Sequence, residues 1–249
     1  MSFFGDGYLV RSAATTYPDG WRLDRHDHPW GQLAFCNSGV MRVESERTAW
    51  LAPPTRAIWL PAGVAHAIDM KGEVATRFLY LDPVLAAPLP ADPVVLEVTP
   101  LLRELILYIL KRRMLHPDQP GEERQARLLV DLLIEARRID LALPLPRDRR
   151  ALALAQRLQA KPGETAPLAD LARAAGASLR TLQRLFPAET GLTLEAWRQK
   201  ARLIAAVASL SNGAAVTTTA LDCGYDSPSA FITAFKRQFG VTPGRYRSA

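Results

Sequence analysis

The chain has 249 residues, a formal net charge of +6 and 22% charged residues, which suits a folded protein of two ordinary domains. It has no apolar run near the roughly 18 residues of a membrane span, and its first residues lack the pattern of an export signal. Its two cysteines, Cys36 and Cys223, lie far apart, which is typical of a reducing compartment. We therefore expect a cytoplasmic protein without a membrane partner.

Charge is unevenly distributed along the chain. From Arg147 onward there are 15 Lys/Arg and 7 Asp/Glu, whereas the residues before it have 16 and 18. A basic C-terminal segment beside a near-neutral remainder favours a polyanionic partner such as nucleic acid. Charge alone does not distinguish a surface that binds nucleic acid from one that is merely solvated, so the choice between them depends on the motifs.

The first part of the chain is rich in strand-like segments. Short runs of apolar and β-branched residues are broken by turn residues such as Pro53-Pro54 and the Pro-Ala-Gly at 61–63. This spacing favours a sandwich or barrel, and we assign residues 1–95 to one β-domain. The clearest predicted strands are Ala34–Cys36, Val40–Val43, Ala57–Leu60 and Thr76–Leu81.

Two amphipathic helices are predicted next, over Pro100–Met114 and Glu122–Ile139, because their apolar residues recur near every 3.6 positions. A Pro- and Gly-containing break separates them, so residues 96–143 form a helical hairpin. We expect this hairpin to make a homodimer; the alternative is that it only packs on the β-domain. Residues 144–150 then have the composition of an interdomain linker.

The remainder, residues 151–249, is predicted to be entirely helices and turns. Its expected helices are Arg150–Gln159, Leu168–Ala174, Ser178–Glu189, Thr193–Leu210, Val216–Cys223 and Ser227–Phe239.

The last of these helices belongs to a helix-turn-helix pattern. Gly224 supplies the backbone freedom for a tight turn, Ser227 is a good N-cap, and Pro228 follows at the first helical position. Phenylalanines at every fourth position predict a buried stripe, and Gly240 with Pro243 ends the helix. That stripe directs Ser229, Thr233, Lys236 and Arg237 outward.

An earlier segment repeats this layout, with Gly176 as the turn and Ser178 as the cap. Its predicted exposed face consists of Arg180, Thr181, Gln183 and Arg184. Arginine can bond guanine, and glutamine can bond adenine, each through two hydrogen bonds. The helix between the units would be about 27 Å long, and successive major-groove segments on one DNA face repeat about every 34 Å. Both units could therefore contact one DNA face.

The residues of the two units resemble the AraC/XylS family of DNA-binding domains. The first unit matches at Leu168, Leu171, Ala172, Gly176, Ser178, Arg180, Leu182, Arg184, Phe186, Gly191 and Arg202. The second matches at Gly224, Tyr225, Ser227, Phe231, Phe235, Lys236, Phe239, Gly240, Pro243, Tyr246 and Arg247. The resemblance implies a transcription regulator that reads bases at Arg180, Gln183 and Arg184, with further contacts at Ser229 and Thr233. Pro187 lies inside the first recognition helix and is expected to end or bend its last turn.

Three of the four histidines form a second pattern. His26, His28, Gln32 and Gly39 resemble the first cupin motif, and Pro61, Gly63 and His66 resemble the second. The resemblance implies a metal held by these histidines, with Gln32 in a position where metal-binding cupins have Glu. Imidazole ligands suit Ni, Zn, Cu or Fe. An organic ligand without metal, and a structural role for the histidines, remain alternatives.

Aromatic residues of the β-domain suggest where a small molecule could bind. Trp30, Phe35 and Trp59 could line an apolar pocket. The alternative is that they belong to the core of the barrel.

These observations predict an α+β protein: a cupin-like β-barrel with a helical hairpin, then an all-α domain with two helix-turn-helix units joined by a long helix. We expect a DNA-binding transcription regulator controlled by a small ligand or metal, needing no cofactor. Its partners would be double-stranded promoter DNA and, for an activator, RNA polymerase. The rival is a metal-dependent cupin enzyme, an oxygenase or isomerase, which the amide at Gln32 disfavours. A regulator without an effector is a third possibility.

Overall fold

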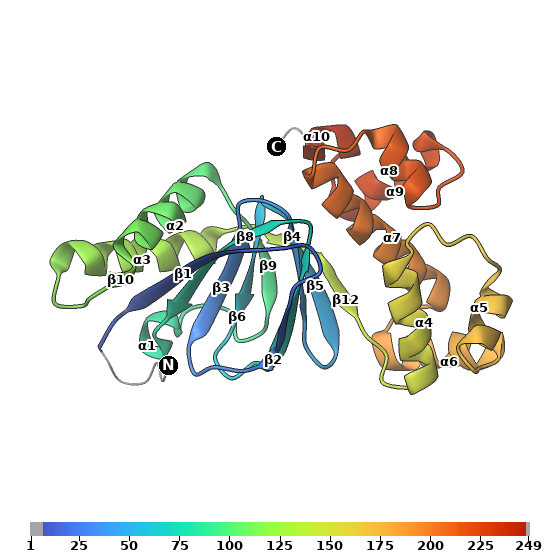
Figure 1. The fold of residues 1–249 in the computed structure, drawn as a ribbon, viewed down its shortest axis with the longest axis horizontal. Coiled ribbons are helices and arrows are strands. Elements are labelled where there is room, and N and C mark those ends of the chain that lie inside the picture. The colour runs from blue at the N-terminus through green and yellow to red at the C-terminus, as the bar shows by residue number, and fades with distance from the viewer. Residues whose placement is uncertain (1–6, 248–249) are drawn as a thin grey trace. The chain divides into compact units, whose positions relative to one another are not determined.

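The computed structural model describes residues 7–247, which form two compact units. The N-terminal unit comprises the residues up to Ser45 together with Trp50–Ala142, and the C-terminal unit comprises Glu46–Ala49 together with the chain from Leu143 onward. The first unit contains most of the strands and a pair of long helices, and the second is helical (Figure 1). None of the described helices is long and apolar enough to cross a membrane.

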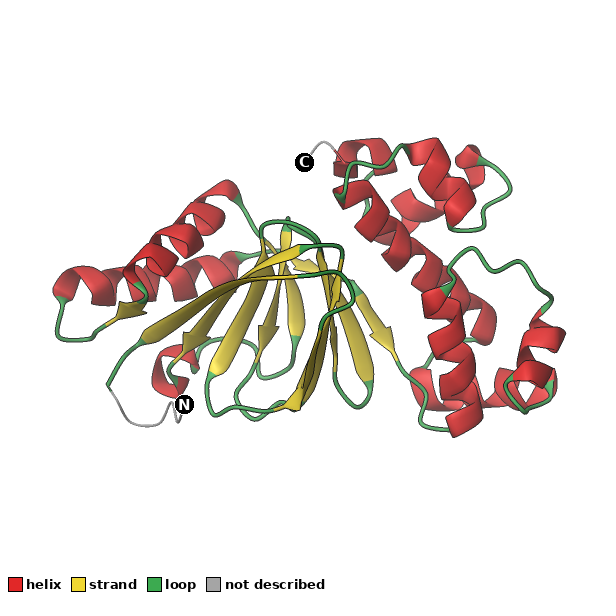
Figure 2. Cartoon of the chain, viewed as in Figure 1, coloured by secondary structure: helices red, strands yellow, loops and turns green. Residues whose placement is uncertain are grey.

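The strands of the described chain make two antiparallel sheets (Figure 2). One sheet has seven strands in the order β10-β1-β8-β3-β6-β9-β11, and the other has five in the order β12-β5-β4-β7-β2. The first sheet contains β10 (Met114–Leu115), β1 (Val10–Tyr17), β8 (Val74–Leu81), β3 (Gly31–Cys36), β6 (Arg56–Leu60), β9 (Val94–Glu97) and β11 (Arg138–Ile139). The second contains β12 (Ala142–Pro144), β5 (Thr48–Ala52), β4 (Val40–Glu44), β7 (His66–Lys71) and β2 (Arg22–His26).

The register of β3 decides which of its side chains face which layer. Leu33 pairs with Trp59 on β6 and with Leu79 on β8, and all three side chains join one core cluster with the long helices. Because successive side chains of a strand alternate between faces, Gln32 points to the opposite face. Tyr80, which pairs with Gln32, points the same way. On this second face, Gln32 and Tyr80 both contact His28, which follows β2.

Two helices cover the outer face of the seven-stranded sheet. They are α2 (Pro100–Arg112) and α3 (Pro120–Glu135), and a short helix, α1 (Pro83–Ala86), precedes them. Thr99 caps α2 by accepting a hydrogen bond from the Leu102 N–H. The first residue of each long helix is a proline, and its missing N–H costs nothing there because the first N–H groups of a helix have no partner within the helix. The predicted hairpin therefore forms and packs on the sheet through its buried apolar face.

The C-terminal unit consists of seven helices in its described part. They are α4 (Arg149–Ala160), α5 (Leu168–Ala174), α6 (Leu179–Thr190), α7 (Leu194–Ser211), α8 (Val216–Asp222), α9 (Pro228–Phe239) and α10 (Pro243–Arg247). Helices α5 and α6 form the first helix-turn-helix, and α8 and α9 form the second. Helix α7 joins them and is about 27 Å long at 1.5 Å per residue.

Local sequence signals explain the ends of both recognition helices. Ser178 accepts a hydrogen bond from the Thr181 N–H at the start of α6, and Ser227 does the same for the Ala230 N–H at the start of α9. Both helices end at a left-handed glycine, Gly191 or Gly240.

Aromatic side chains fill the cores of the two helix-turn-helix units. Phe186 of α6 meets Trp197 of α7 edge to face, with ring centroids 5.4 Å apart. In the second helix-turn-helix, Phe231 and Phe235 are fully buried and their ring centroids lie 5.5 Å apart. Tyr246 of α10 contacts Phe235. Such edge-to-face pairs are favourable beyond their buried area. They hold each recognition helix against α7 or α10.

Strand pairing in the described chain gives two antiparallel sheets, as expected for the β-domain, and does not by itself close them into a barrel. The structure differs from the sequence-based expectations in two places. The expected linker at 144–150 is partly ordered, because Pro144 ends β12 and Asp148 caps α4 through the Arg150 and Ala151 N–H groups. Helix α6 continues past Pro187 to Thr190, and the Thr190 hydroxyl bonds the Phe186 carbonyl at 2.7 Å, so proline does not end it.

Candidate functional site

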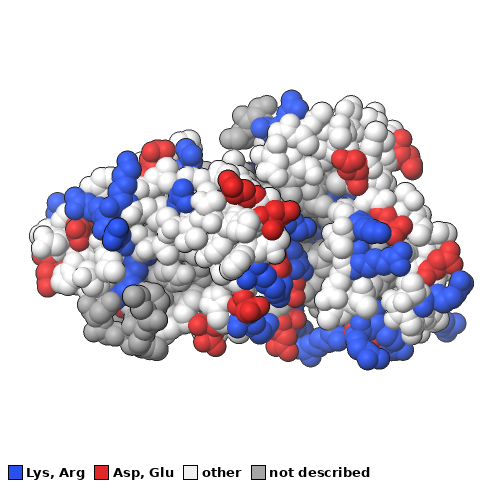
Figure 3. Space-filling model, in the orientation of Figure 1, with Lys and Arg blue, Asp and Glu red and all other residues white. Residues whose placement is uncertain are grey.

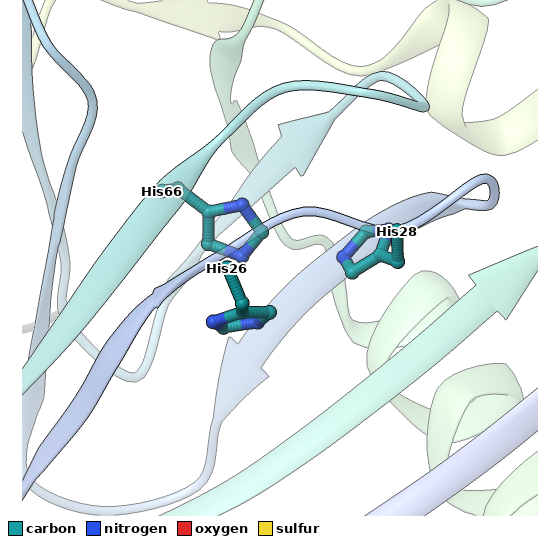
Figure 4. Close-up of side chains that lie close together, drawn as sticks. All are labelled: His26, His28 and His66. Atoms are coloured by element: carbon teal, nitrogen blue, oxygen red, sulfur yellow. The ribbon is translucent and has the colours of Figure 1, made fainter. Parts of the chain in front are cut away.

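Three histidines of the N-terminal unit lie close together, two from the end of β2 and the loop after it and one from β7 (Figure 4). His26 ends β2 and is the register partner of His66, the first residue of β7, and His28 lies in the turn after β2. The ring centroids are 4.5 Å apart for His26 and His66, and 5.3 Å apart for His28 and His66. One nitrogen from each ring lies within 4.8 Å of the others, which is compatible with a shared metal ion.

Backbone carbonyls orient all three imidazoles in the same way. The Nδ1 atoms of His26, His28 and His66 lie 2.7, 2.7 and 2.8 Å from the carbonyl oxygens of residues 24, 30 and 64. A carbonyl only accepts hydrogen bonds, so each Nδ1 carries a proton and donates it. Each Nε2 then holds a lone pair in the neutral ring. This is the arrangement by which outer hydrogen bonds prepare a histidine to bind a metal.

His66 is the buried member of the cluster. Burial, more than the charges of His26 and His28, lowers the pKa of His66 to about 4, so the ring is neutral at physiological pH. Its Nε2 is buried and has no hydrogen-bond partner within the described chain. Leaving a buried acceptor unsatisfied is costly. A metal ion bound to this lone pair would remove the cost, so the residues present fit a metal.

Gln32 borders the cluster from β3. Its side chain is buried, and Oε1 as placed lies 2.9 Å from Nε2 of His28. Because His28 donates through Nδ1, its Nε2 can only accept, so the Gln32 amide must offer its NH₂ group there. Gln32 therefore competes with a metal for His28 in this arrangement, where a carboxylate would instead add a ligand.

A tyrosine that the sequence patterns missed also borders the site. The ring of Tyr80 meets His28 edge to face, at a centroid distance of 5.4 Å. Burial raises the pKa of Tyr80 to about 12, so it remains a neutral phenol. Its position opposite Gln32 on β8 could be inferred only from strand register.

The three aromatic residues predicted to line a pocket do not gather around the histidines. Phe35 and Trp59 are buried in the core cluster beneath the long helices, on the opposite face from Gln32, and the Trp59 indole donates to the Pro90 carbonyl. Trp30 is buried elsewhere, with the Arg11 guanidinium 4.1 Å from its ring centroid. Their placement favours the alternative expectation, a core role, for Phe35 and Trp59.

The recognition helix α6 exposes the predicted base-reading side chains. Arg180, Gln183 and Arg184 are exposed, while Leu182, Leu185 and Phe186 face the core. Thr181 is half-buried, and its hydroxyl lies 2.9 Å from that of Ser178. Gln183 Nε2 donates a weak hydrogen bond of 3.4 Å to Glu195 of α7. One face of α6 thus exposes three long polar side chains to solvent.

The second recognition helix, α9, exposes shorter side chains. Ser229, Thr233, Lys236 and Arg237 are all exposed. A hollow of about 470 Å³ is lined by Ser229, Thr233 and Arg237, together with Gln199 and Tyr225. Lysine and arginine side chains are numerous over α4 to α6 as well (Figure 3), which suits a polyanionic partner.

Protein-family models match the chain in two segments. An AraC-like ligand binding domain matches residues 10–185, and a helix-turn-helix domain matches residues 171–249. The HTH-type transcriptional regulator NimR of Escherichia coli (strain K12) is 35% identical over 221 residues, covering 89% of this chain and 81% of NimR. The HTH-type transcriptional regulator RipA of Corynebacterium glutamicum is 35% identical over 103 residues, which are 41% of this chain and 31% of RipA.

Two solved structures are also similar. ToxT from Vibrio cholerae aligns over 96% of this chain and 98% of its own, with 10% identity and a TM-score of 0.40. The DNA-binding domain of AdpA, solved in complex with a target DNA, covers 41% of this chain and 92% of its own, with 28% identity and a TM-score of 0.38. These TM-scores are low, so the assignment depends on the sequence matches.

The sequence matches decide between the regulator and the cupin enzyme. NimR and RipA are both named transcriptional regulators, and both matched models describe parts of such proteins. The chain is therefore a regulator and not an enzyme. With an AraC-like ligand binding domain followed by a helix-turn-helix domain that binds DNA, the chain belongs to the AraC family of transcription regulators.

Proposed function

We propose that this regulator senses a divalent transition metal at His26, His28 and His66 and changes its binding to promoter DNA in response. The observation that carries the metal assignment is the grouping of the three rings: each has Nδ1 bonded to a backbone carbonyl, and one nitrogen of each ring lies within 4.8 Å of the others. The bound ion would act as a cross-link between β2 and β7. Imidazole nitrogens suit Ni, Zn, Cu or Fe.

Metal binding would change the local structure of the site in a specific way. His28 can bind the ion through Nε2 only after its contact with Gln32 is broken. Gln32 would then turn its amide oxygen toward the ion or move aside. Such a difference between the free and bound forms is what an effector needs, because a ligand shifts a conformational equilibrium only by its differential affinity for the two states.

The proposed DNA contacts divide between the two recognition helices. Arg180, Gln183 and Arg184 would read base edges from α6, with Thr181 contacting a phosphate. Ser229 and Thr233 are short, so α9 would contribute mainly phosphate contacts through Lys236 and Arg237. The exposure of all these side chains except the half-buried Thr181 supports this division.

The hairpin of α2 and α3 is the proposed homodimer interface. Leu128 and Ile134 of α3 are exposed apolar residues, and Tyr108 of α2 is also exposed. Exposed apolar side chains that gather into one patch are typical of a surface that another subunit covers. We further propose that the protein acts in the cytoplasm and, as an activator, would contact RNA polymerase.

Effector sensing is tested by DNA binding with and without metal. The full chain, stripped with EDTA, is titrated with labelled promoter DNA in the presence of Ni²⁺, Zn²⁺, Cu²⁺ or Fe²⁺ or with no metal. We expect at least one ion to change the affinity or the footprint of the wild-type chain, and His26→Ala to remove this response. Equal binding under all conditions, with DNA recognition intact, would leave a regulator without a metal effector.

Loss of a base-reading arginine should weaken specific binding. Arg184→Ala is expected to cost about 1–3 kcal/mol and to relax sequence preference at one base pair, because the guanidinium makes two hydrogen bonds to a guanine edge. Lys236→Ala should instead weaken all sequences equally and lower the salt slope of log K by about 1. Fluorescence anisotropy over a series of salt concentrations measures both effects.

The control for these variants is Arg138→Ala. Arg138 is exposed on β11 in the N-terminal unit, outside the helix-turn-helix domain, and its replacement removes the same charge. If Arg184→Ala lowers affinity no more than Arg138→Ala and retains full sequence preference, Arg184 does not read a base.

A further inference from the structure

The loop between α4 and α5 is bound to the middle of α7 by an arginine. Arg202 Nε donates to the Pro162 carbonyl at 3.0 Å, and its Nη2 donates to the Glu164 carbonyl at 3.0 Å. Arg198, one turn earlier on α7, also donates to the Glu164 carbonyl. The two arginines thus hold two backbone carbonyls that lie about 40 residues earlier in the chain. This loop leads directly into the first helix-turn-helix.

The same loop touches the turn of the second helix-turn-helix. A Cβ added at Gly163 would lie 2.3 Å from the backbone oxygen of Asp222, which is closer than real Cβ atoms approach. A Cβ added at Gly224 would lie 2.7 Å from Arg202 Nη2 and 3.1 Å from the Gly163 Cα. Gly224 also has a φ of +73°, which other residues rarely adopt. Only glycine therefore fits at either position without displacing its neighbours.

Charge acts on this contact in both directions. Burial, followed by the repulsion of Arg202, lowers the pKa of Arg198, so holding the two cations together has a cost. Glu164 lies on the same loop, and its pKa is lowered first by the Ala166 N–H and then by Arg157, 3.0 Å away. Its negative charge acts favourably on Arg198. The loop is therefore held by directed hydrogen bonds and by charge, in addition to packing.

The loop before the first helix-turn-helix is thus joined both to the middle of α7 and directly to the turn of the second helix-turn-helix. We propose that Arg202, Gly163 and Gly224 form a clamp that fixes the separation and rotation of α6 and α9, so that the protein accepts operators with only one spacing between the two contacted segments. Arg202 is a positioning residue in this arrangement. The inference rests on the proposed function in one respect, that both recognition helices contact DNA.

Operator spacing matters because α6 and α9 must contact their DNA segments at the same time. Each base pair inserted between the contacted segments moves one of them by about 3.4 Å along the DNA axis and rotates it. A rigid protein must lose the contacts of one recognition helix or distort the DNA. A protein with independently moving units, held by α7 alone, could follow the displaced segment.

The experiment uses the full chain and a duplex that it selects from a random-sequence library, with the contacted segments located by hydroxyl-radical footprinting. Duplexes with one or two base pairs inserted between these segments are then compared with the selected spacing. We expect the wild-type chain to lose affinity by about tenfold or more on insertion. The spacing ratio is the affinity at the selected spacing divided by the affinity after insertion. In Arg202→Met this ratio should fall by at least about threefold, and binding at the selected spacing should be weaker.

A general loss of stability or charge would not produce that result, because it lowers affinity for every spacing alike. Arg138→Met removes the same charge at an exposed site of the N-terminal unit and should retain the wild-type ratio. If Arg202→Met gives no cooperative unfolding transition, the spacing ratio is measured instead for Arg202→Lys and Gly163→Ala, and both should also lower it. Both keep the net charge, while lysine lacks the second donor group and alanine collides with Asp222.

Two results overturn the proposal in distinguishable ways. If the wild-type chain binds all spacings with equal affinity, or if the folded variants keep its spacing ratio, the clamp does not set spacing, although the chain still recognises DNA. If the wild-type chain selects no DNA sequence, the proposed DNA contacts fail and the clamp proposal fails with them.

Discussion

Replacement of Trp197 by alanine should lower the free energy of unfolding of the C-terminal unit by about 3–5 kcal/mol. Trp197 is fully buried on α7, packs edge to face on Phe186, and donates its indole N–H to the Pro144 carbonyl at 2.6 Å. Alanine leaves a cavity and an unpaired carbonyl in the core of the first helix-turn-helix. We therefore expect specific DNA binding to be lost with the fold.

Urea unfolding followed by far-UV circular dichroism measures this effect. Trp197→Phe keeps most of the buried aromatic volume and should cost less, with about 1 kcal/mol of the loss due to the missing hydrogen bond. Trp21→Ala is the matched control, since Trp21 is about half exposed. A Trp197→Ala variant no less stable than Trp21→Ala would contradict the assigned core.

The second large effect is expected at the histidine cluster. His66→Ala should weaken binding of Ni²⁺ or Zn²⁺ by at least about a hundredfold, because it removes a ligand, whereas loss of an outer hydrogen-bonding partner already costs ten- to hundredfold. The remaining two imidazoles cannot surround the ion. Isothermal titration calorimetry, with competition by a chelator of known affinity, measures the change.

Two further variants make this result interpretable. His116→Ala is the control, because His116 lies outside the cluster and contacts Tyr8 at a centroid distance of 5.3 Å. His26→Ala removes an exposed ligand, so its loss of metal affinity is separable from any effect on folding. If His66→Ala and His26→Ala both bind metal as the wild-type chain does, the cluster is not a metal site.

The helices of the C-terminal unit could be predicted from sequence because their signals are local. Helix α5 begins and ends at the predicted residues, and Ser178, Thr193 and Ser227 each cap a helix within one residue of the expected start. A cap and its N–H partner lie two or three positions apart in the chain, so both are present in a short window.

The strands were predicted less completely. The runs at β3, β4, β6 and β8 are strongly apolar, but β1 (Val10–Tyr17) and β2 (Arg22–His26) are largely exposed and lack that signal. They exist because β1 pairs along its whole length with β8, and β2 pairs with β7. Such pairing joins residues far apart in sequence and is decided by tertiary structure.

The sequence by itself determined the family, the two recognition helices and the identity of the three histidines. Only the tertiary structure decided that their Nδ1 atoms all bond carbonyls, that Phe35 and Trp59 face the helices, and that Gly163 touches the turn at Gly224. Motifs and caps depend on neighbours in the chain. The face of a strand, the tautomer of a ring and the approach of two loops depend on partners that only folding brings together.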